Sequence, residues 1–213
     1  MPTPNSRIML PQIALRQIVT ETDIAQVDLY PLPYEDGALP DQEARALLAL
    51  LVATGPKVIL EIGTYHGATT LRIAHQLPTS QIHTIDLSLA DAAQGPYLSD
   101  QHLITKRHLV GGHFLSRPQY ANITQHYGNT HSYDFRRLGN PGFFFIDGSH
   151  SYFYVHNDSN KCLALCGDKG VFVWHDADPN HPGVLQLLEE WRRLGRDVRL
   201  IEGTRLGYWD SSA

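Results

Sequence analysis

The stretch that decides the fold is KVILEIGTYHGAT, residues 57–69. Its first six residues, Lys57–Ile62, are mostly apolar and β-branched, which predicts a short strand. Gly63 permits the tight turn that ends this strand, and Gly67 lets a ligand approach the backbone where the next helix begins. That helix is predicted over Ala68–Leu77, because a proline follows it directly.

The same alternation of strand and helix patterns continues along the chain. The predicted strands are Lys57–Ile62, Gln81–Asp86, Asn122–Tyr127, Gly142–Asp147, Gly170–Trp174, Asp197–Glu202 and Arg205–Trp209. The predicted helices are Asp41–Ala53, Ala68–Leu77, Ser151–Cys166 and His181–Leu194, with Ser99–Leu109 as a further candidate inside an ambiguous insertion, 87–121. Alternating strands and helices predict a parallel sheet covered by helices on both faces.

The last two strands are joined only by Gly203-Thr204, which is too short for a crossover helix. They are therefore expected to be antiparallel. The sequence thus predicts an α/β domain over residues 39–213. Its sheet is doubly wound and Rossmann-like, with seven mostly parallel strands and an antiparallel C-terminal hairpin.

Residues 1–38 read differently from the rest of the chain. Six of the thirteen prolines lie within the first forty residues, and no sustained period is present. We interpret this segment as an N-terminal arm with at most one short helix and no place in the sheet. Its apolar residues are Ile8, Met9, Leu10, Ile13, Leu15 and Ile18. We expect them to fold over the strand ends as a lid or to pack on a second copy in a homodimer.

Composition limits the classes of protein that the chain can belong to. It has 213 residues, a mass of 23.9 kDa, a formal net charge of −5 and a pI near 6.1, which argues against a dedicated nucleic-acid binder. Two cysteines exclude a disulfide scaffold. The longest apolar run, Ala46–Ala53, is far too short to span a membrane, and the first ten residues do not read as a secretory signal. We expect a cytoplasmic protein with a small-molecule partner.

In parallel sheets ligands bind beyond the carboxyl ends of the strands, so the residues there matter most. Glu61 stands two before Gly63, where it suits a cationic ligand better than a pyrophosphate. The spacing from Gly63 to Gly67 is G-x-x-x-G, not the G-x-G-x-x-G of a dinucleotide site. Asp86, at the end of the second strand, is placed to accept both hydroxyls of a ribose. The alternative for Gly63 and Gly67 is a glycine-rich turn that binds no ligand. The alternative for Asp86 is an aspartate that only caps the next turn.

These residues resemble the motifs of class I S-adenosylmethionine-dependent methyltransferases. Within that class, FFIDGSHSY at 144–152 is similar to the F-I-D-G-D-H-S-Y segment of a small-molecule methyltransferase family. VWHD at 173–176 resembles the end of that family's fifth strand, and IEGTRLG at 201–207 resembles its last hairpin. The resemblance covers about residues 39–210. It implies that the protein transfers a methyl group from S-adenosylmethionine.

The resemblance also implies roles for the cofactor-binding residues. The residues around the cofactor would be Glu61, Gly63, Thr64, Tyr65, Gly67, Thr69, Asp86, Asn129 and Asp147. Asp86 would hold the ribose. The turn at 128–130 resembles the family's G-D-S turn beside the adenine, with Asn129 in place of the usual acid. An amide can both donate to and accept from the adenine edge.

The residues of the chemical step are expected after the fourth and fifth strands. Asp147, His150, His175 and Asp176 gather there, and this donor set suits magnesium or manganese. By resemblance to sugar and polyketide O-methyltransferases, Asp147 and Asp176 would hold the divalent ion. His175 is a further candidate ligand, and Ser149 replaces an acid of the family.

His150 has two alternative roles in the sequence, as a metal ligand or as the general base. A simpler alternative is that His150 and His175 only cap strand ends, and His181 is expected to begin a helix rather than to bind metal. The leading hypothesis is metal-assisted O-methylation of a small molecule, with catalytic residues His150, Asp147 and Asp176. The alternatives are metal-free methylation with a histidine base, a non-catalytic cofactor-binding protein of the same fold, and a nicotinamide-dependent oxidoreductase, against which the glycine spacing counts.

Overall fold

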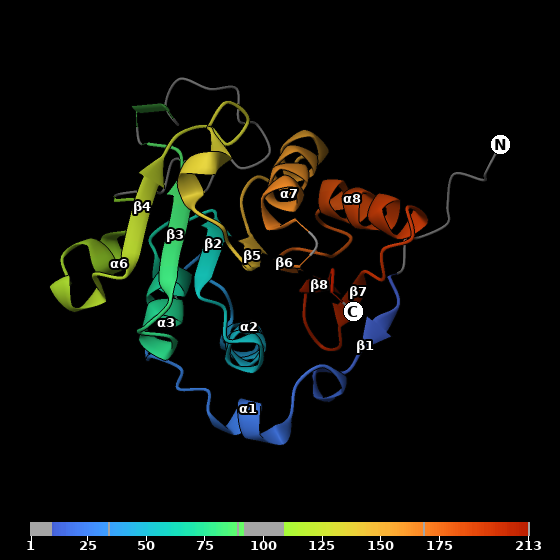
Figure 1. Ribbon diagram of the computed structural model, residues 1–213, viewed down its shortest axis with the longest axis horizontal. Helices are drawn as coiled ribbons and strands as arrows, with labels where there is room; N and C mark the ends of the chain where they lie inside the picture. The colour runs from blue at the N-terminus through green and yellow to red at the C-terminus, as the bar shows by residue number, and fades with distance from the viewer. Residues whose placement is uncertain (1–9, 34, 89, 92–108, 168, 213) are drawn as a thin grey trace.

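An eight-stranded sheet forms the centre of the computed structural model, which describes residues 10–33, 35–88, 90–91, 109–167 and 169–212 (Figure 1). The strand order is β1-β7-β8-β6-β5-β2-β3-β4. The strands are β1 (Gln12–Ile13), β2 (Val58–Ile62), β3 (Gln81–Asp86), β4 (Ile123–Tyr127), β5 (Phe143–Ile146), β6 (Val171–Trp174), β7 (Arg199–Ile201) and β8 (Gly207–Asp210). All paired strands are parallel except that β8 runs antiparallel to both of its neighbours.

Helices cover both faces of the sheet. The α-helices are α1 (Glu21–Ala25), α2 (Asp41–Thr54), α3 (Ala68–Gln76), α6 (Gly112–Leu115), α7 (Tyr152–Cys166) and α8 (Pro182–Arg193), and the 3-10 helices are Leu15–Gln17, Pro118–Tyr120 and Phe135–Leu138. α2 and α3 lie on one face, and α7 and α8 lie on the other (Figure 1). No helix in the described part of the chain combines the length and the apolar character that a bilayer crossing requires.

Strand β5 shows why this sheet is buried on both faces. Phe143 and Phe145 point into the core under α2, whereas Phe144 and Ile146 point into the core under α7 and α8. All four are at most 4% exposed. Continuous apolar runs of this kind are typical of central parallel strands, because no side of the strand meets water.

The fold class predicted from the sequence is confirmed, with one correction to the strand count. The predicted helices and strands in the described residues are present, and none of their ends is shifted by more than two residues. The candidate helix Ser99–Leu109 lies outside the described residues, apart from its last residue. The sheet, however, has eight strands rather than seven.

The eighth strand comes from the N-terminal arm, so the prediction that the arm has no place in the sheet is wrong. Gln12–Ile13 pairs in parallel with β7, and Leu200 N donates to Pro11 O at 2.9 Å. Leu10 is 6% exposed and lies in the core. The arm therefore has two stabilising effects at this edge. It buries an apolar side chain in the core, and its backbone supplies hydrogen-bond partners for the exposed edge of the sheet.

The rest of the arm runs along α2 and α3 toward the strand ends. Val19 is buried in the core, and α1 packs on α2. Arg72 of α3 holds the arm by a hydrogen bond from its guanidinium to Tyr30 O at 3.3 Å. The same guanidinium donates to Asp41 Oδ1, at the start of α2, at 2.7 Å. Whether the arm also acts as a lid or contacts a second copy stays a prediction.

Candidate functional site

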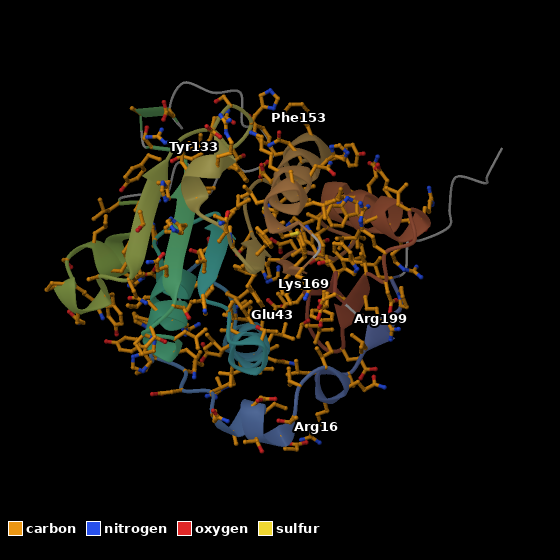
Figure 2. All side chains as sticks on the ribbon, viewed as in Figure 1. Arg16, Glu43, Tyr133, Phe153, Lys169 and Arg199 are labelled. Carbon is orange, nitrogen blue, oxygen red and sulfur yellow. The ribbon has the colours of Figure 1, made fainter. Side chains whose placement is uncertain are left out.

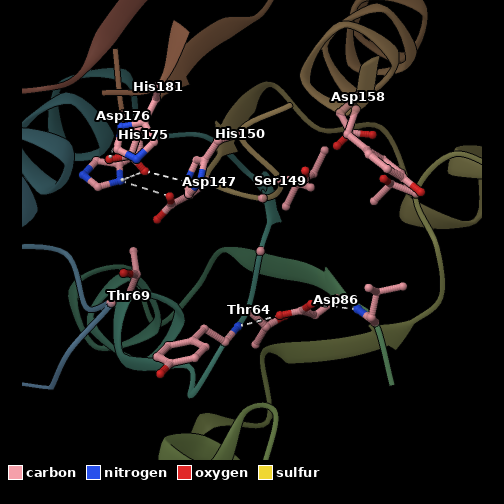
Figure 3. A pocket seen from close by; sticks show the side chains of 18 of the residues that line it. Thr64, Thr69, Asp86, Asp147, Ser149, His150, Asp158, His175, Asp176 and His181 are labelled. Carbon is pink, nitrogen blue, oxygen red and sulfur yellow. Dashed lines mark hydrogen bonds and ion pairs between the residues drawn. The ribbon is translucent and has the colours of Figure 1, made fainter. Parts of the chain in front are cut away.

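A cavity of about 700 Å³ opens at the carboxyl ends of the strands, where the strand order reverses between β2 and β5 (Figure 3). The sequence-predicted residues that line it are Gly63, Thr64, Tyr65, Gly67, Thr69, Asp86, Asn129, Asp147, His150, His175 and Asp176. Arm residues 35–38 form part of its wall. Side chains predicted from five separate strand ends therefore meet in one place, as the topology requires.

Glu61 is the exception among the predicted residues, because it does not line the cavity. Its side chain is 0% exposed, and its Oε2 accepts hydrogen bonds from the hydroxyls of Thr70 and Thr84. Burial raises the pKa of Glu61 to about 8, although these hydrogen bonds favour the charged form. Glu61 is predicted to lie around the methionine part of a cofactor; the structure places its side chain outside the cavity lining, between Thr70 of α3 and Thr84 of β3.

The two glycines of the loop are explained by packing. A Cβ on Gly63 (φ +99°) would lie 1.9 Å from Asp147 O, so the loop contacts the backbone after β5. A Cβ on Gly67 (φ +86°) would lie 2.6 Å from the ring of Phe114. Gly67 is therefore required by the Phe114 side chain of α6, in addition to any ligand, and no pattern in the sequence predicts this contact.

Asp86 both lines the cavity and fixes the loop. Its Oδ2 accepts from the backbone N of Tyr65 at 2.7 Å, and its Oδ1 accepts from Leu87 N at 2.7 Å. Tyr65 has a left-handed backbone (φ +50°), an unfavourable conformation for a tyrosine that this hydrogen bond helps to hold. Asp86 is 7% exposed and lines the cavity from this fixed position.

On the far side of the cavity lies the turn after β4. Asn129 Nδ2 donates to the hydroxyl of Tyr154 at 3.0 Å, and Asn129 Oδ1 accepts from His131 N at 2.9 Å. Tyr154 and Asp158, both from α7, line the cavity beside this turn. Sequence reasoning missed these two residues, because nothing in a helical pattern marks the face that meets a loop.

Asp176 is the centre of the opposite side of the cavity. Its Oδ2 lies 2.7 Å from His150 Nε2 and 3.1 Å from His175 Nδ1, and its Oδ1 lies 2.5 Å from Arg205 Nη1. His175 Nδ1 also lies 3.0 Å from Asp147 Oδ1. Asp176 itself has a left-handed backbone (φ +55°), which aspartate tolerates better than most residues.

A third carboxylate, not predicted from the sequence, completes this group. Glu43, on the first turn of α2 (Figure 2), is 5% exposed. Its Oε2 lies 2.8 Å from His175 Nε2, and its Oε1 accepts from Arg205 N at 2.7 Å. In the sequence Glu43 is marked only as one of two acids, with Asp41, at the start of an Ala/Leu-rich helix. Arg205 lies in the hairpin motif 201–207 but had no assigned role.

Opposite charges lie next to one another in this buried group. Burial favours the neutral form of Asp176, yet hydrogen bonds from His150 and His175 hold the pKa of this carboxyl well below its usual range. Burial opposes a charge on His175, but Asp147, Asp176 and Glu43 raise the pKa of its imidazole well above the usual value. The repulsion between carboxylates, on which the metal prediction was based, is thus already relieved by the cations of His175 and Arg205.

Within the part of the chain that the structure describes, two sets of three side chains have donor atoms that all lie within 4.8 Å of one another. One is the predicted set, Asp147, His175 and Asp176. The other joins His150, Asp176 and His181. His181 precedes α8, as predicted, yet it also comes within 3.5 Å of Asp176. In the first set Glu43 holds His175 Nε2, so that Nδ1 faces the two carboxylates, an arrangement that fits a histidine ligand.

The fold and the cavity together define a class I methyltransferase architecture, with the open site at the point where the strand order reverses. The sequence profile of a family described as "Methyltransferase domain" matches residues 60–177, more than half of the chain. The protein belongs to this methyltransferase domain family. Curated proteins provide no significant sequence match to it.

Solved structures support the same fold. Cofactor-bound Rv0187 from MTB has 17% identity and a TM-score of 0.58, covering 90% of this chain and 88% of that one. The O-methyltransferase from Bacillus cereus in complex with SAH has 17% identity and a TM-score of 0.55, covering 92% and 88%. SAH-bound Podospora anserina methyltransferase PaMTH1 has 16% identity and a TM-score of 0.55, covering 82% and 80%. At these identities the likeness shows the fold alone.

Proposed function

We propose that the protein transfers a methyl group from S-adenosylmethionine to a hydroxyl of a small molecule, with His150 as the general base. The observation that carries this proposal is the contact of 2.7 Å between His150 Nε2 and Asp176 Oδ2 at the wall of the cavity. A base held by a buried carboxylate is suited to remove a proton from a bound hydroxyl.

The residues around the cavity fit the cofactor. S-adenosylmethionine supplies an electrophilic methyl group on a sulfonium sulfur. Asp86, held by Tyr65 N, is the acceptor for the ribose hydroxyls, and the loop from Gly63 to Gly67 surrounds the methionine part. A volume of about 700 Å³ suits a cofactor with part of a small acceptor. The lining carries six carboxylates and Arg205 as its only Lys or Arg among the described residues, which suits a cationic ligand.

The surroundings of Asp176 explain how His150 would work. A hydroxyl with a pKa of about 10 needs a base near neutral pH, and an imidazole is matched to this task. When His150 takes up the proton, it becomes an imidazolium cation. The Asp176 carboxylate, whose Oδ2 lies 2.7 Å from His150 Nε2, stabilises this positive charge. Arg205 holds the other oxygen of Asp176, which keeps the carboxylate in one orientation. Methyl transfer then needs only alignment of the acceptor oxygen with the methyl group.

The test begins with binding and proceeds to turnover. Calorimetry should detect S-adenosylmethionine or S-adenosylhomocysteine but not NAD, which separates this proposal from an oxidoreductase. Release of S-adenosylhomocysteine is then measured over a panel of small hydroxylated acceptors, which separates an enzyme from a binder. His150→Ala should lose turnover, keep cofactor affinity, and regain part of its rate at high pH. Full activity of His150→Ala at neutral pH would overturn the role of the base.

Metal-assisted transfer is the second candidate, favoured by the donor set of Asp147, His175 and Asp176 with Glu43 behind it. These residues would hold a magnesium or manganese ion, which would lower the pKa of an acceptor hydroxyl. Turnover that stops in excess chelator and returns with either ion would support this candidate. Full turnover in excess chelator, by protein without bound metal, would support the histidine base. The homodimer and the cytoplasmic location stay predictions from the sequence.

A further inference from the structure

The first turn of α8 lies directly against the chain segment that carries His150. A Cβ on Gly183 would lie 2.4 Å from His150 O and 2.5 Å from Tyr152 N, which are both backbone atoms. Ordinary van der Waals contact begins at 3.4 Å, so even a methyl group here would displace the helix or the segment. Gly183 is not among the glycines with a positive φ. The position therefore requires glycine because of this close approach and not because of its own backbone conformation.

A second contact joins α8 to the same segment. Glu190 follows Gly183 by seven residues, which places the two on one face of the helix. Glu190 Oε2 accepts a hydrogen bond from the Tyr152 hydroxyl at 2.5 Å. Tyr152 is thus held twice by α8, at its backbone next to Gly183 and at its hydroxyl by Glu190. Because Tyr152 is the first residue of α7, these contacts fix the place where the segment between β5 and α7 ends.

The segment is also fixed by contacts outside α8. Near its start, Asp147 N donates to Ile62 O at 2.8 Å. Near its end, Val155 N donates to Ser151 O at 3.1 Å, within the first turn of α7. A closely packed interior transmits a displacement rather than absorbing it. A side chain added to this face of α8 would therefore move the residues between the two fixed points, 148–150.

His150 is the residue in this stretch whose exact position matters most. Its Nε2 lies 2.7 Å from Asp176 Oδ2, the contact on which its role as a base depends. His181, which directly precedes α8, places its ring centroid 4.4 Å from that of His150. Figure 3 shows both histidines on the same side of the cavity as Asp176. The start of α8 therefore restricts the imidazole of His150 as well as its backbone.

We propose that Gly183 and Glu190 are positioning residues for methyl transfer, which hold the 150–152 segment so that His150 stays in contact with Asp176. This inference rests on the proposed function, since it takes His150 as the general base. Both residues act through His150 and not on the acceptor itself. The difference between 2.4 Å and 3.4 Å corresponds to a displacement of about 1 Å, and a misplacement of that size lowers turnover by about 100-fold.

The experiment measures release of S-adenosylhomocysteine by the full chain, with the acceptor of the panel that gives the highest turnover. Gly183→Ala should lower kcat roughly 100-fold, with little change in KM for the acceptor. Affinity for S-adenosylhomocysteine in calorimetry should be unchanged, because Asp86 fixes the cofactor loop independently of α8. Gly142→Ala is the matched control, since a Cβ on this exposed glycine would meet nothing within 4 Å, and its kcat should equal that of the unaltered protein.

Combining Gly183→Ala with His150→Ala shows whether the loss passes through the base. General-base catalysis contributes about 10²–10⁴-fold, so the residual rate of His150→Ala remains measurable. Gly183→Ala should cause no further loss in this background, because the imidazole that it displaces is absent. A glycine needed only for packing would instead cause the same loss in both backgrounds. That result, or full turnover of Gly183→Ala, would overturn the proposal.

Should Gly183→Ala not fold, as judged by circular dichroism, Glu190→Ala removes the other contact without adding an atom. It should cause a smaller loss of kcat that also disappears in the His150→Ala background. An unchanged kcat, or a loss that persists in that background, overturns the proposal.

A failure of the proposed function gives a separate result. If no acceptor of the panel is methylated, the proposed function fails, and imidazole NMR signals still test the geometry. The signals of His150, identified by their absence in His150→Ala, should shift in Gly183→Ala but not in Gly142→Ala. Unchanged signals in Gly183→Ala would overturn the positioning role.

Discussion

Replacing Glu61 by glutamine should change the pH dependence of the protein's stability. Glu61 is 0% exposed, and burial raises its pKa from 4.5 to about 8 despite hydrogen bonds from Thr70 and Thr84. Between pH 4.5 and about 8 the folded protein keeps a proton that the unfolded chain has lost. Because the unfolded state binds fewer protons in this window, the free energy of unfolding decreases as pH rises, and the full stability is present only below pH 4.5.

The magnitude follows from the pKa difference. At about 1.4 kcal/mol per pH unit, the change from 4.5 to about 8 corresponds to at most about 5 kcal/mol lost by pH 8. Glutamine does not titrate, so the variant lacks this loss. Its amide nitrogen would take the place of Glu61 Oε1, which is buried without a partner among the described residues. A buried amide N–H without an acceptor lowers the free energy of unfolding by about 1–3 kcal/mol, and at low pH this is the main difference between the two proteins. The variant should thus be less stable at pH 5 and more stable at pH 8.

Urea unfolding at pH 5, 6, 7 and 8 measures both curves. The difference in unfolding free energy between the two proteins should change by about 1.4 kcal/mol per pH unit, in favour of Glu61→Gln as pH rises. Glu202→Gln makes the same chemical change at an exposed residue and serves as the control. Parallel stability curves for Glu61→Gln and the unaltered protein would refute the assignment of a neutral, buried Glu61.

Three further predictions concern the loop, the ribose site and the arm. Asp86→Ala should weaken S-adenosylmethionine binding by about 1.5–3 kcal/mol in calorimetry, and unchanged affinity in a folded variant would exclude the ribose role. Gly67→Val, at φ +86° and with a Cβ 2.6 Å from the Phe114 ring, should abolish binding and lower the Tm; tight binding would contradict the loop geometry. Glu35 Oε2 joins two histidines, at 2.9 Å and 3.2 Å, so Glu35→Gln should speed limited proteolysis of the arm, and an unchanged rate would show that this contact does not hold it.

The parts of the structure that the sequence predicts are those determined by neighbouring residues. The run Lys57–Ile62 followed by Gly63 predicts a strand and a turn without reference to any distant residue. The ligand end of the sheet follows from topology alone, since parallel strands place Asp86, Asp147 and Asp176 at the same edge. For that reason the predicted site residues, other than Glu61, meet in one cavity.

The parts that the sequence does not predict depend on pairs that are distant in the chain. A two-residue strand such as Gln12–Ile13 has no period of its own and exists only because β7 offers an open edge. Glu43 and His175 are 132 residues apart, and no local pattern joins them. Asp158 lies on the face of α7 that meets the turn after β4, and the pattern of a helix does not show which of its faces meets a turn. Glu61 lies outside the cavity lining for a related reason, because an acid near the end of a strand can point into the core as well as into the cavity.

The histidine-base and metal-assisted hypotheses require different contacts around Asp176, on the acceptor side of the cavity. Asp176 is engaged at both oxygens, by His150 and His175 at one and by Arg205 at the other. A divalent ion bound by Asp147, Asp176 and His175 Nδ1 would take the place of a proton on that nitrogen, and with it the positive charge that His175 brings to the carboxylates. General-base catalysis by His150 leaves all of these contacts in place. It uses the contact from His150 to Asp176, which is shorter than the contact from His175. The contacts of Asp176 therefore support the histidine base as the first candidate, and Arg205, whose guanidinium joins Asp176 to Glu43, offsets part of the negative charge of this site.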